Sequence, residues 1–258
     1  MQNLLSRVQS WCRRAMSAHL ARRPFRLECD RAIVSFTFDD FPRSALTEGG
    51  RILNQYGAKG TFYVSLGLMD QQIPAGEGFS ADDLRTAVAD GHEMGCHTYA
   101  HCHSWETPPR VFEDSILENQ RRVREIAPGV TFATLSYPIH CPRPGTKRRA
   151  ARHFAACRGG GQTFNFGEVD LNSLSAYFLE KSRDNMGAVR AMIDETCRVG
   201  GWLILATHDV AENPSPFGCT PAFFEQVVEH AAKSEAQICP VAKALELQEI
   251  QVQAPQSV

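Results

Sequence analysis

Short apolar runs alternate with amphipathic, helix-like stretches along most of this 258-residue chain. The runs that predict strands span residues 32–38, 60–64, 93–96, 134–137, 153–157, 177–179, 202–207 and 237–239. Between them, Ser80-Ala-Asp-Asp is a capping-box variant, Gly91 is a helix stop, and Thr220-Pro221 is an N-cap followed by proline at the first helical position. About eight such strand–helix units predict an α/β barrel.

Residues 158–176 interrupt this alternation, because Gly159-Gly160-Gly161 is followed there by a polar stretch. We expect a loop or an irregular closure of the barrel in this segment. We also expect a flexible tail at residues 251–258. The predicted domains are an N-terminal helical extension at 1–28, a barrel domain at 29–250 and the tail.

Residues 2–20 predict an amphipathic helix with arginines beside its apolar face. Its apolar positions are Leu4, Leu5, Val8, Trp11, Cys12, Ala15 and Met16. The run of about 7 to 15 apolar residues that a signal peptide needs is missing. Two interpretations stay open: the helix lies on an anionic membrane, or it packs on its own domain or on a partner subunit, giving a homo-oligomer. We favour packing.

Composition narrows the classes of function. The 27 basic and 29 acidic residues give a formal charge of −2, which provides no bulk attraction to nucleic acid. The nine cysteines include no C-x-x-C pair, so we expect free thiols in a reducing compartment. No segment has the apolar length that a membrane span needs. We therefore expect a cytoplasmic protein without integral membrane association.

The apolar run 32–38 ends in two adjacent carboxylates, Asp39 and Asp40. Because side chains alternate along a strand, one of the two must face the mouth of a barrel. One carboxylate can then bind a cation while the other stays free to accept a proton. On its own, such a pair is more often a turn after a strand.

Two histidines, His97 and His101, lie four residues apart just beyond the strand predicted at 93–96. If the chain turns into a helix there, this spacing brings both imidazoles to one cation. Two histidines and one carboxylate form a known hydrolytic metal set with positions left for water and substrate. His92 and His103 lie nearby and complicate the choice, although we expect them to be structural or surface residues.

The buried run 202–207 ends in His208 and Asp209. Like the other two signals, this pair lies at a strand end, where a parallel barrel presents its catalytic residues. The three strand ends together supply a base, a metal site and an imidazole able to protonate a leaving group.

Over roughly residues 31–245 the sequence resembles the polysaccharide deacetylase family, that is, the NodB-homology or carbohydrate esterase family 4 proteins. The motifs that carry the resemblance are Phe36-Thr-Phe-Asp39-Asp40, His97-Thr-Tyr-Ala-His101 and Leu203-Ile-Leu-Ala-Thr-His208. The resemblance implies a distorted, incomplete (β/α) barrel of about seven parallel strands. It also implies a catalytic base at Asp39, a general acid at His208, and metal ligands at Asp40, His97 and His101.

The family's third motif usually reads like Arg-Pro-Pro-Tyr-Gly, whereas the aligned residues here are Ser136-Tyr-Pro-Ile-His140. The arginine that would orient the catalytic acid is therefore absent, and Arg143 or Arg158 is the candidate replacement. Ile139 occupies the position whose backbone N–H helps to form the oxyanion hole in relatives. We expect Tyr137 and Ile139 to face substrate or oxyanion, and Asp209 to support His208. Phe41 stands where a glycine commonly follows the two aspartates, a change expected to narrow the cleft.

The residues predict metal-assisted hydrolysis, and the resemblance implies a metal-dependent deacetylase, a hydrolase of linear amides that removes acetyl groups from an N- or O-acetylated carbohydrate by attack of metal-activated water. Mixed nitrogen and oxygen ligands suit zinc as the single divalent ion, and cobalt, nickel, manganese and iron are also compatible. Two rivals stay open: an amidohydrolase acting on a small cytoplasmic amide, and a non-catalytic carbohydrate-binding relative that retains the metal.

Overall fold

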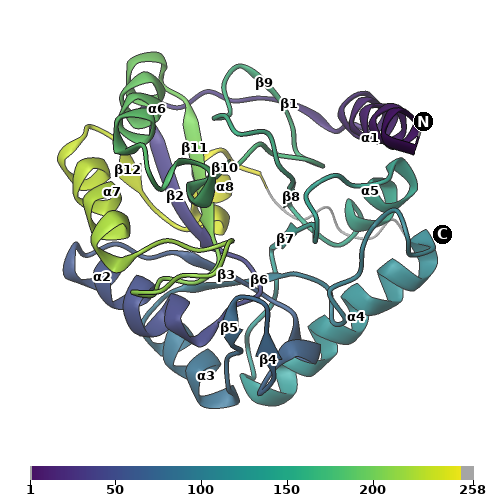
Figure 1. The fold of residues 1–258 in the computed structure, drawn as a ribbon, viewed down its shortest axis with the longest axis horizontal. Helices are drawn as coiled ribbons and strands as arrows, with labels where there is room; N and C mark the ends of the chain where they lie inside the picture. The colour runs from purple at the N-terminus through teal and green to yellow at the C-terminus, as the bar shows by residue number, and fades with distance from the viewer. Residues whose placement is uncertain (1, 251–258) are drawn as a thin grey trace.

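The computed structural model describes residues 2–250, and the tail predicted at 251–258 lies outside the described residues. Its main sheet has the strand order β10-β11-β2-β3-β6-β7-β8, with all neighbours parallel, and β12 pairs with the start of β2. These strands are β2 (Ile33–Phe38), β3 (Thr61–Val64), β6 (Glu93–Cys96), β7 (Thr134–Ser136), β8 (Ala156–Arg158), β10 (Tyr177–Phe178), β11 (Trp202–Thr207) and β12 (Gln237–Ile238). All eight predicted strands are confirmed, and the sheet curls into an incomplete barrel (Figure 1).

The largest shift from the predicted bounds concerns β8, which was expected at 153–157. His153 still belongs to the turn after α5 (Pro144–Ala150), because its N–H donates to the carbonyl oxygen of Ala150 at 3.0 Å. The strand therefore begins at Ala156 and ends at Arg158. This shift puts Arg158 at a strand end, on the face where the candidate site lies.

The barrel does not close between its edge strands β8 and β10. The segment after β8 fills that side, where Arg158 forms an isolated parallel bridge with Leu174 and the Gly159 N–H donates to the Leu174 carbonyl at 2.9 Å. Within it, β9 (Glu168–Asp170) pairs antiparallel with β1 (Pro24–Arg26). The irregular closure expected for residues 158–176 is confirmed, while the short β1–β9 ribbon was not foreseen.

Helices surround the sheet as an outer layer (Figure 1). They are α2 (Arg51–Gln55), α3 (Ala81–Ala89), α4 (Pro109–Ile126), α5, α6 (Met186–Val199), α7 (Pro221–Lys233) and α8 (Val241–Leu247), with shorter helical turns at Ala45–Gly50, Leu66–Leu68 and Leu179–Ser182. Ser80 forms the capping box of α3 with Asp83, and Thr220 caps α7, as their sequences predict. A small hairpin, β4 (Gln72–Ile73) and β5 (Gly76–Glu77), projects after β3.

The core between sheet and helices fixes the strand ends. Every residue of β2 and β11 is buried, as expected for parallel strands covered on both faces. Phe38 stacks on Phe62 of β3 at a centroid distance of 4.7 Å and also contacts Phe224 of α7 at 5.6 Å. Because the strands are parallel and in register, their carboxyl ends emerge together on one face of the molecule.

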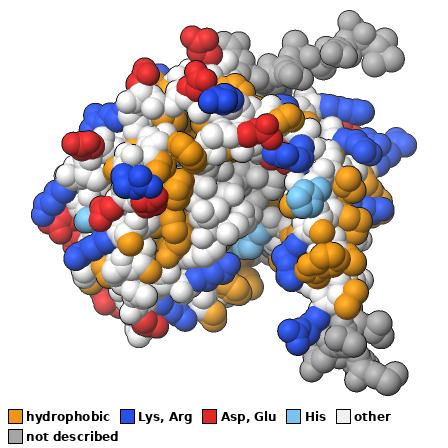
Figure 2. All heavy atoms as spheres, turned by 90° about the horizontal axis from the view of Figure 1, so that it is seen from above, with side chains coloured by type: hydrophobic (Ala, Val, Ile, Leu, Met, Phe, Trp, Pro, Cys, Tyr) orange, Lys and Arg blue, Asp and Glu red, His pale blue; other side chains and the backbone are white. Residues whose placement is uncertain are grey.

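The predicted N-terminal helix is present as α1 (Gln2–His19), and its C-terminal end packs on the barrel domain. Lys147, a fully buried residue of α5, donates to the Ser17 carbonyl at 2.8 Å and to the Asp170 carboxylate at 2.6 Å. Farther along, Trp11 keeps 66% of its surface exposed. Hydrophobic and basic side chains are exposed together toward the right of Figure 2, where α1 lies. A partner subunit on this face stays a prediction, and none of the described helices is both long and apolar enough to cross a bilayer.

Candidate metal centre

The candidate site is assembled at the carboxyl ends of neighbouring strands. Asp39 continues the ladder after β2, since its N–H donates to the Thr207 carbonyl at 2.9 Å. His97 does the same after β6, with its N–H on the Val64 carbonyl at 3.0 Å. His208 follows β11 directly. Residues that are far apart in the sequence thus meet on one face because parallel strands end there.

Asp40, His97 and His101 form a cluster whose candidate ligand atoms lie within 4.8 Å of one another. The Oδ1 atom of Asp40 lies 3.5 Å from Nε2 of His97 and 3.3 Å from Nε2 of His101. This oxygen is buried and has no hydrogen-bond partner among the described residues. A buried carboxylate oxygen between two imidazole nitrogens is the arrangement that a divalent cation would satisfy. The residues therefore fit a metal ion.

A second contact prepares His97 for such a role. Its Nδ1 lies 2.8 Å from the backbone carbonyl oxygen of Ser136, so Nδ1 must carry the proton and Nε2 keeps its lone pair. Burial lowers the pKa of His97 to about 4, although the nearby Asp39 and Asp40 raise it. The neutral imidazole with Nε2 free is the form that binds a metal.

The backbone of the site is strained. Six of the ten described non-glycine residues with positive φ lie in these loops: Asp40, Phe41, Thr98, His101, Ile139 and His140. Such conformations cost free energy and persist where the surroundings impose them, often at functional sites. The side chain of Phe41 is fully buried and stacks on Phe79 at 4.8 Å, so this residue fills the core and not the cleft beside the metal cluster.

Asp39 is buried against Arg158, with which it forms an ion pair through Oδ1. Burial raises the pKa of Asp39, but Arg158 and the imidazoles of His97 and His208 outweigh that effect and hold the pKa below its usual range. Its second oxygen, Oδ2, has no partner among the described residues. Asp39 is therefore a charged carboxylate with one oxygen committed and one free.

Arg158 reaches Asp39 from the neighbouring strand. Ser136, which aligns with the family's missing arginine, is the register partner of Arg158 in the β7–β8 pair, and its Oγ accepts from Arg158 at 2.5 Å. The guanidinium is thus one strand away from the aligned position. Arg143 lies instead at the start of α5, with its backbone N–H on the Ser104 hydroxyl at 2.8 Å. Of the two candidates, only Arg158 contacts Asp39.

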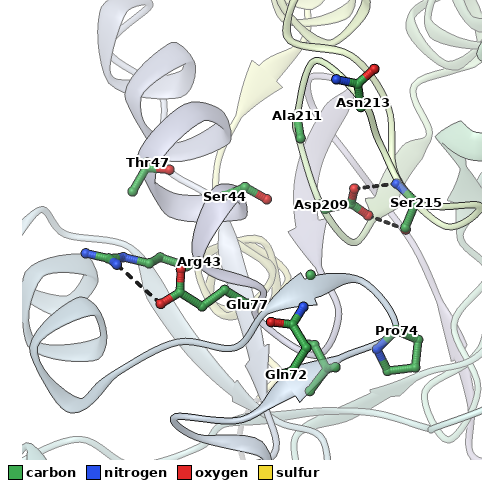
Figure 3. Close-up of a pocket in the computed structure, with 12 residues that line it drawn as sticks. Arg43, Ser44, Thr47, Gln72, Pro74, Glu77, Asp209, Ala211, Asn213 and Ser215 are labelled. Carbon is green, nitrogen blue, oxygen red and sulfur yellow. Dashed lines mark hydrogen bonds and ion pairs between the residues drawn. The ribbon is translucent and has the colours of Figure 1, made fainter.

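His208 is supported by a loop and Asp209 stabilises that loop. The Nδ1 of His208 lies 3.3 Å from the Phe217 carbonyl oxygen. The Asp209 carboxylate accepts hydrogen bonds from the Ser215 N–H at 2.7 Å and from the Ser215 hydroxyl at 2.5 Å (Figure 3). Asp209 also lines a cavity of about 620 Å³ beside the β4–β5 hairpin. Asp209 therefore supports His208 indirectly: it holds the 209–219 loop, and the Phe217 carbonyl of that loop contacts the imidazole.

The segment aligned with the third motif forms a tight turn. Ile139 has a φ of +63°, and the His140 N–H closes the turn on the Tyr137 carbonyl at 3.1 Å. The Ile139 N–H donates to none of the described residues, and its side chain is 53% exposed. By contrast, Tyr137 has its side chain fully buried in the core. This geometry leaves the Ile139 N–H available to a ligand, whereas the Tyr137 ring packs away from solvent.

Two residues that the sequence did not single out lie beside the site. His140 has a buried Nδ1 without a partner, packs its ring 4.2 Å from Phe178, and has a pKa lowered to about 3 by burial. Glu180 has a buried, unpartnered Oε2, and burial raises its pKa while the nearby His208 lowers it. Glu180 follows β10 by two residues, so the strand-end rule could have identified it.

The other two histidines lie outside the cluster. His92 is buried, and its Nδ1 accepts the Gly60 N–H at 3.0 Å. His103 accepts the Trp105 N–H at 3.1 Å and lies 3.9 Å from the carboxylate of Glu106. Both have local structural contacts, in keeping with the expectation from the sequence.

Known proteins resemble both the sequence and the fold. The polysaccharide deacetylase family model matches residues 28–153, which include Asp40, His97 and His101. A chitin deacetylase from Colletotrichum lindemuthianum is 38% identical over 76 residues, a stretch that spans 29% of this chain and 29% of that protein. The solved structure described as the chitin deacetylase of this fungal pathogen has a TM-score of 0.61 at 19% identity, covering 84% of this chain and 89% of that one.

Two further structures share the fold. A family 4 acetyl xylan esterase from Clostridium thermocellum, in complex with a cobalt ion, has a TM-score of 0.61 at 20% identity, covering 85% of this chain and 93% of that one. The Xyl-CE4 domain of a multidomain xylanase from the hindgut metagenome of Trinervitermes trinervoides has a TM-score of 0.62 at 14% identity, covering 88% and 96%. Residues 28–153 thus match the polysaccharide deacetylase family, and most of the chain shares the barrel fold of these solved structures.

Proposed function

We propose that the protein is a metal-dependent deacetylase acting on an acetylated carbohydrate. The observation that carries the proposal is the unpartnered Oδ1 of Asp40 between two imidazole nitrogens, next to a second carboxylate held by a buried arginine. The metal ligands would be Asp40, His97 and His101. Zinc is the first candidate from the donor set, and the cobalt complex of a relative suggests that cobalt is also tolerated.

When bound, a divalent ion would polarise the acetyl carbonyl and make a water molecule more acidic. Asp39 accepts the proton of the attacking water through Oδ2. Arg158 assists by binding Oδ1, which orients the carboxylate and keeps it charged. We therefore assign Asp39 as the general base and Arg158 as its positioning residue.

The Ile139 N–H donates a hydrogen bond to the acetyl oxygen as negative charge develops there. His208 then gives a proton to the departing nitrogen or oxygen, so that the acyl C–N or C–O bond breaks and acetate and the free amine or alcohol are released. The Phe217 carbonyl holds the His208 ring through Nδ1, which leaves Nε2 for that transfer.

The direct test measures acetate release from three substrates: a tetramer of N-acetylglucosamine, an acetylated xylose oligomer and a small acetamide. Each is assayed with chelated enzyme and after zinc or cobalt is added back. We expect release from at least one saccharide that depends on metal. Release from the acetamide alone would favour the small-amide hydrolase, and binding of the tetramer without release from any substrate would favour the non-catalytic relative.

A further inference from the structure

A groove of about 810 Å³ separates α1 from the segments that close the barrel. Arg14 and Ser17 of α1 line one side, while Phe166, Phe178 and Lys181 line the other. The surface is hollowed between the right-hand projection that contains α1 and the rest of the domain (Figure 2). The groove lies outside residues 28–153, the segment matched by the family model, apart from His140 and Cys141.

The groove begins beside the catalytic residues. Phe178 lines it, and the same ring lies 5.5 Å from the guanidinium of Arg158, which is paired with Asp39. His140, 4.2 Å from Phe178, belongs to the turn that presents the Ile139 N–H. A saccharide whose acetyl group reaches Asp39 would therefore extend its next units into the groove.

The groove is lined by more cations than its carboxylates can pair. Arg22 is paired with Glu168 at 3.1 Å, and Asp170 is paired with the buried Lys147 at 2.6 Å, so both carboxylates that line the groove are already compensated. Arg14 and Lys181 have no carboxylate partner among the described residues. Arg14 donates to the Ser10 hydroxyl, and the Lys181 ammonium lies 4.9 Å from the Phe178 ring centroid. The groove thus carries two cations that a ligand can pair.

Aromatic side chains supply the apolar part of the surface. Phe164, Phe166 and Phe178 all line the groove, and Phe166 keeps 58% of its surface exposed. The flat apolar faces of sugar rings pack well on such rings, while Arg and Lys recognise carboxylate and phosphate oxygens. Aromatic rings combined with unpaired cations are the chemistry of a site for an acidic saccharide.

We propose that this groove binds a negatively charged unit of the substrate, one carrying a carboxylate or a phosphate ester. Lys181 pairs with the anion beside the catalytic residues, and Arg14 extends the positive surface along α1. This inference rests on the proposed deacetylase function. It also gives the N-terminal helix a role in substrate choice.

The test compares a neutral tetramer of N-acetylglucosamine with the same tetramer carrying either a carboxymethyl group or a 6-phosphate. The readout is the ratio of kcat/KM for charged over neutral substrate, and the two charged forms separate carboxylate from phosphate recognition. We expect Lys181→Met and Arg14→Met each to lower this ratio by about 3- to 10-fold, and 0.5 M salt to reduce it in the unmodified protein. Lys181→Glu should lower it further.

Arg124→Met, an exposed arginine of α4 that lies outside the groove, is the matched control and should leave the ratio unchanged. Equal losses on neutral and charged tetramers, or no change in the ratio, would overturn the inference. If the unmodified protein releases no acetate from any tetramer, the deacetylase proposal fails. Calorimetric binding of the same tetramers to the unmodified protein and to Lys181→Met then still tests the groove. Tighter binding of the charged tetramers that is lost in Lys181→Met would support the inference. Equal binding of charged and neutral tetramers would overturn it.

Discussion

Two carboxylates at opposite ends of the main sheet have opposite surroundings. Glu93, at the start of β6, accepts hydrogen bonds from the hydroxyls of Thr61 at 2.7 Å and Thr134 at 2.6 Å, and from the Ala242 N–H at 2.7 Å. Thr61 begins β3, Thr134 begins β7 and Ala242 lies in the first turn of α8. Glu93 itself begins β6, so its carboxylate joins three strands and a helix. Asp39, at the end of β2, has one oxygen bound and one without a partner.

This difference in hydrogen-bond partners separates a structural carboxylate, Glu93, from one that is free to accept a proton, Asp39. Both oxygens of Glu93 are satisfied, as buried polar atoms usually are. At the other end, unpartnered buried atoms accumulate on the groups that surround the cleft: Asp39 Oδ2, Asp40 Oδ1, His140 Nδ1 and Glu180 Oε2. Such atoms cost free energy unless something binds to them. Other unpartnered buried atoms lie elsewhere, among them Tyr63 Oη and His92 Nε2, but the unpartnered carboxylate oxygens among the described residues belong to Asp39, Asp40 and Glu180. Unsatisfied carboxylates, more than burial itself, therefore identify the functional end of the barrel.

The largest expected effect distinguishes the two adjacent aspartates. Asp39→Asn should lower turnover by about two to four orders of magnitude, because the general base is lost, while metal content stays nearly intact. Asp40→Asn should instead weaken metal binding, since a charged ligand is replaced by a neutral amide. Metal analysis of the purified variants, with steady-state assays, checks both. The reverse pattern would mean that the two aspartates have exchanged roles.

The next effect concerns the leaving group. His208→Ala should slow hydrolysis of an acetamide by about 100-fold or more, because an amine leaves poorly unless it is protonated. An acetylated nitrophenol should lose far less, since nitrophenolate leaves unaided. The two kcat values, measured on the same preparation, give the comparison. Equal losses on both substrates would show that another residue delivers the proton.

Removing Arg158 tests the pairing at the functional end. Arg158→Met leaves the Asp39 carboxylate buried and unpaired, so we expect the free energy of unfolding to fall by about 3 to 5 kcal/mol. The double variant Asp39→Asn, Arg158→Met should recover much of that loss, because the uncompensated charge is gone. Urea unfolding of the single and double variants measures the coupling. Strictly additive changes would show that the ion pair contributes nothing to stability.

Much of this site could be predicted from the sequence, because its residues follow long, buried strands. Asp39 and His208 directly follow six-residue strands whose apolar runs are unmistakable. His97 and His101 are close in sequence, although residues 97–101 form a loop and not the helix expected there. The choice of Arg158 over Arg143 could not be predicted, since it depends on the register of Ser136 with Arg158 across two strands. Strand register is set by tertiary packing, which a local pattern does not reveal. The same holds for the contacts of α1, which reach residues more than a hundred positions away.

The smallest expected effect lies at the structural end. Burial raises the pKa of Glu93 above its ordinary value, although hydrogen bonds from the Ala242 N–H and from Thr134 and Thr61 lower it. The folded state therefore holds a proton that the unfolded chain has already released, between the ordinary pKa of about 4.5 and the raised value. In that window stability should fall as pH rises, with a slope of at most about 1.4 kcal/mol per pH unit for one proton.

Glu93→Gln should remove this slope, because the amide keeps the shape and the acceptor oxygen but does not titrate. The kcat of this variant should stay within about twofold of the value for the unmodified protein, because Glu93 lies at the end of the barrel opposite Asp40, His97 and His101, the end that serves stability in such barrels. Urea unfolding at several pH values gives the slope, and acetate release gives kcat. A large loss of kcat with unchanged stability would contradict the division between the two ends of the barrel, because the satisfied carboxylate would then take part in catalysis.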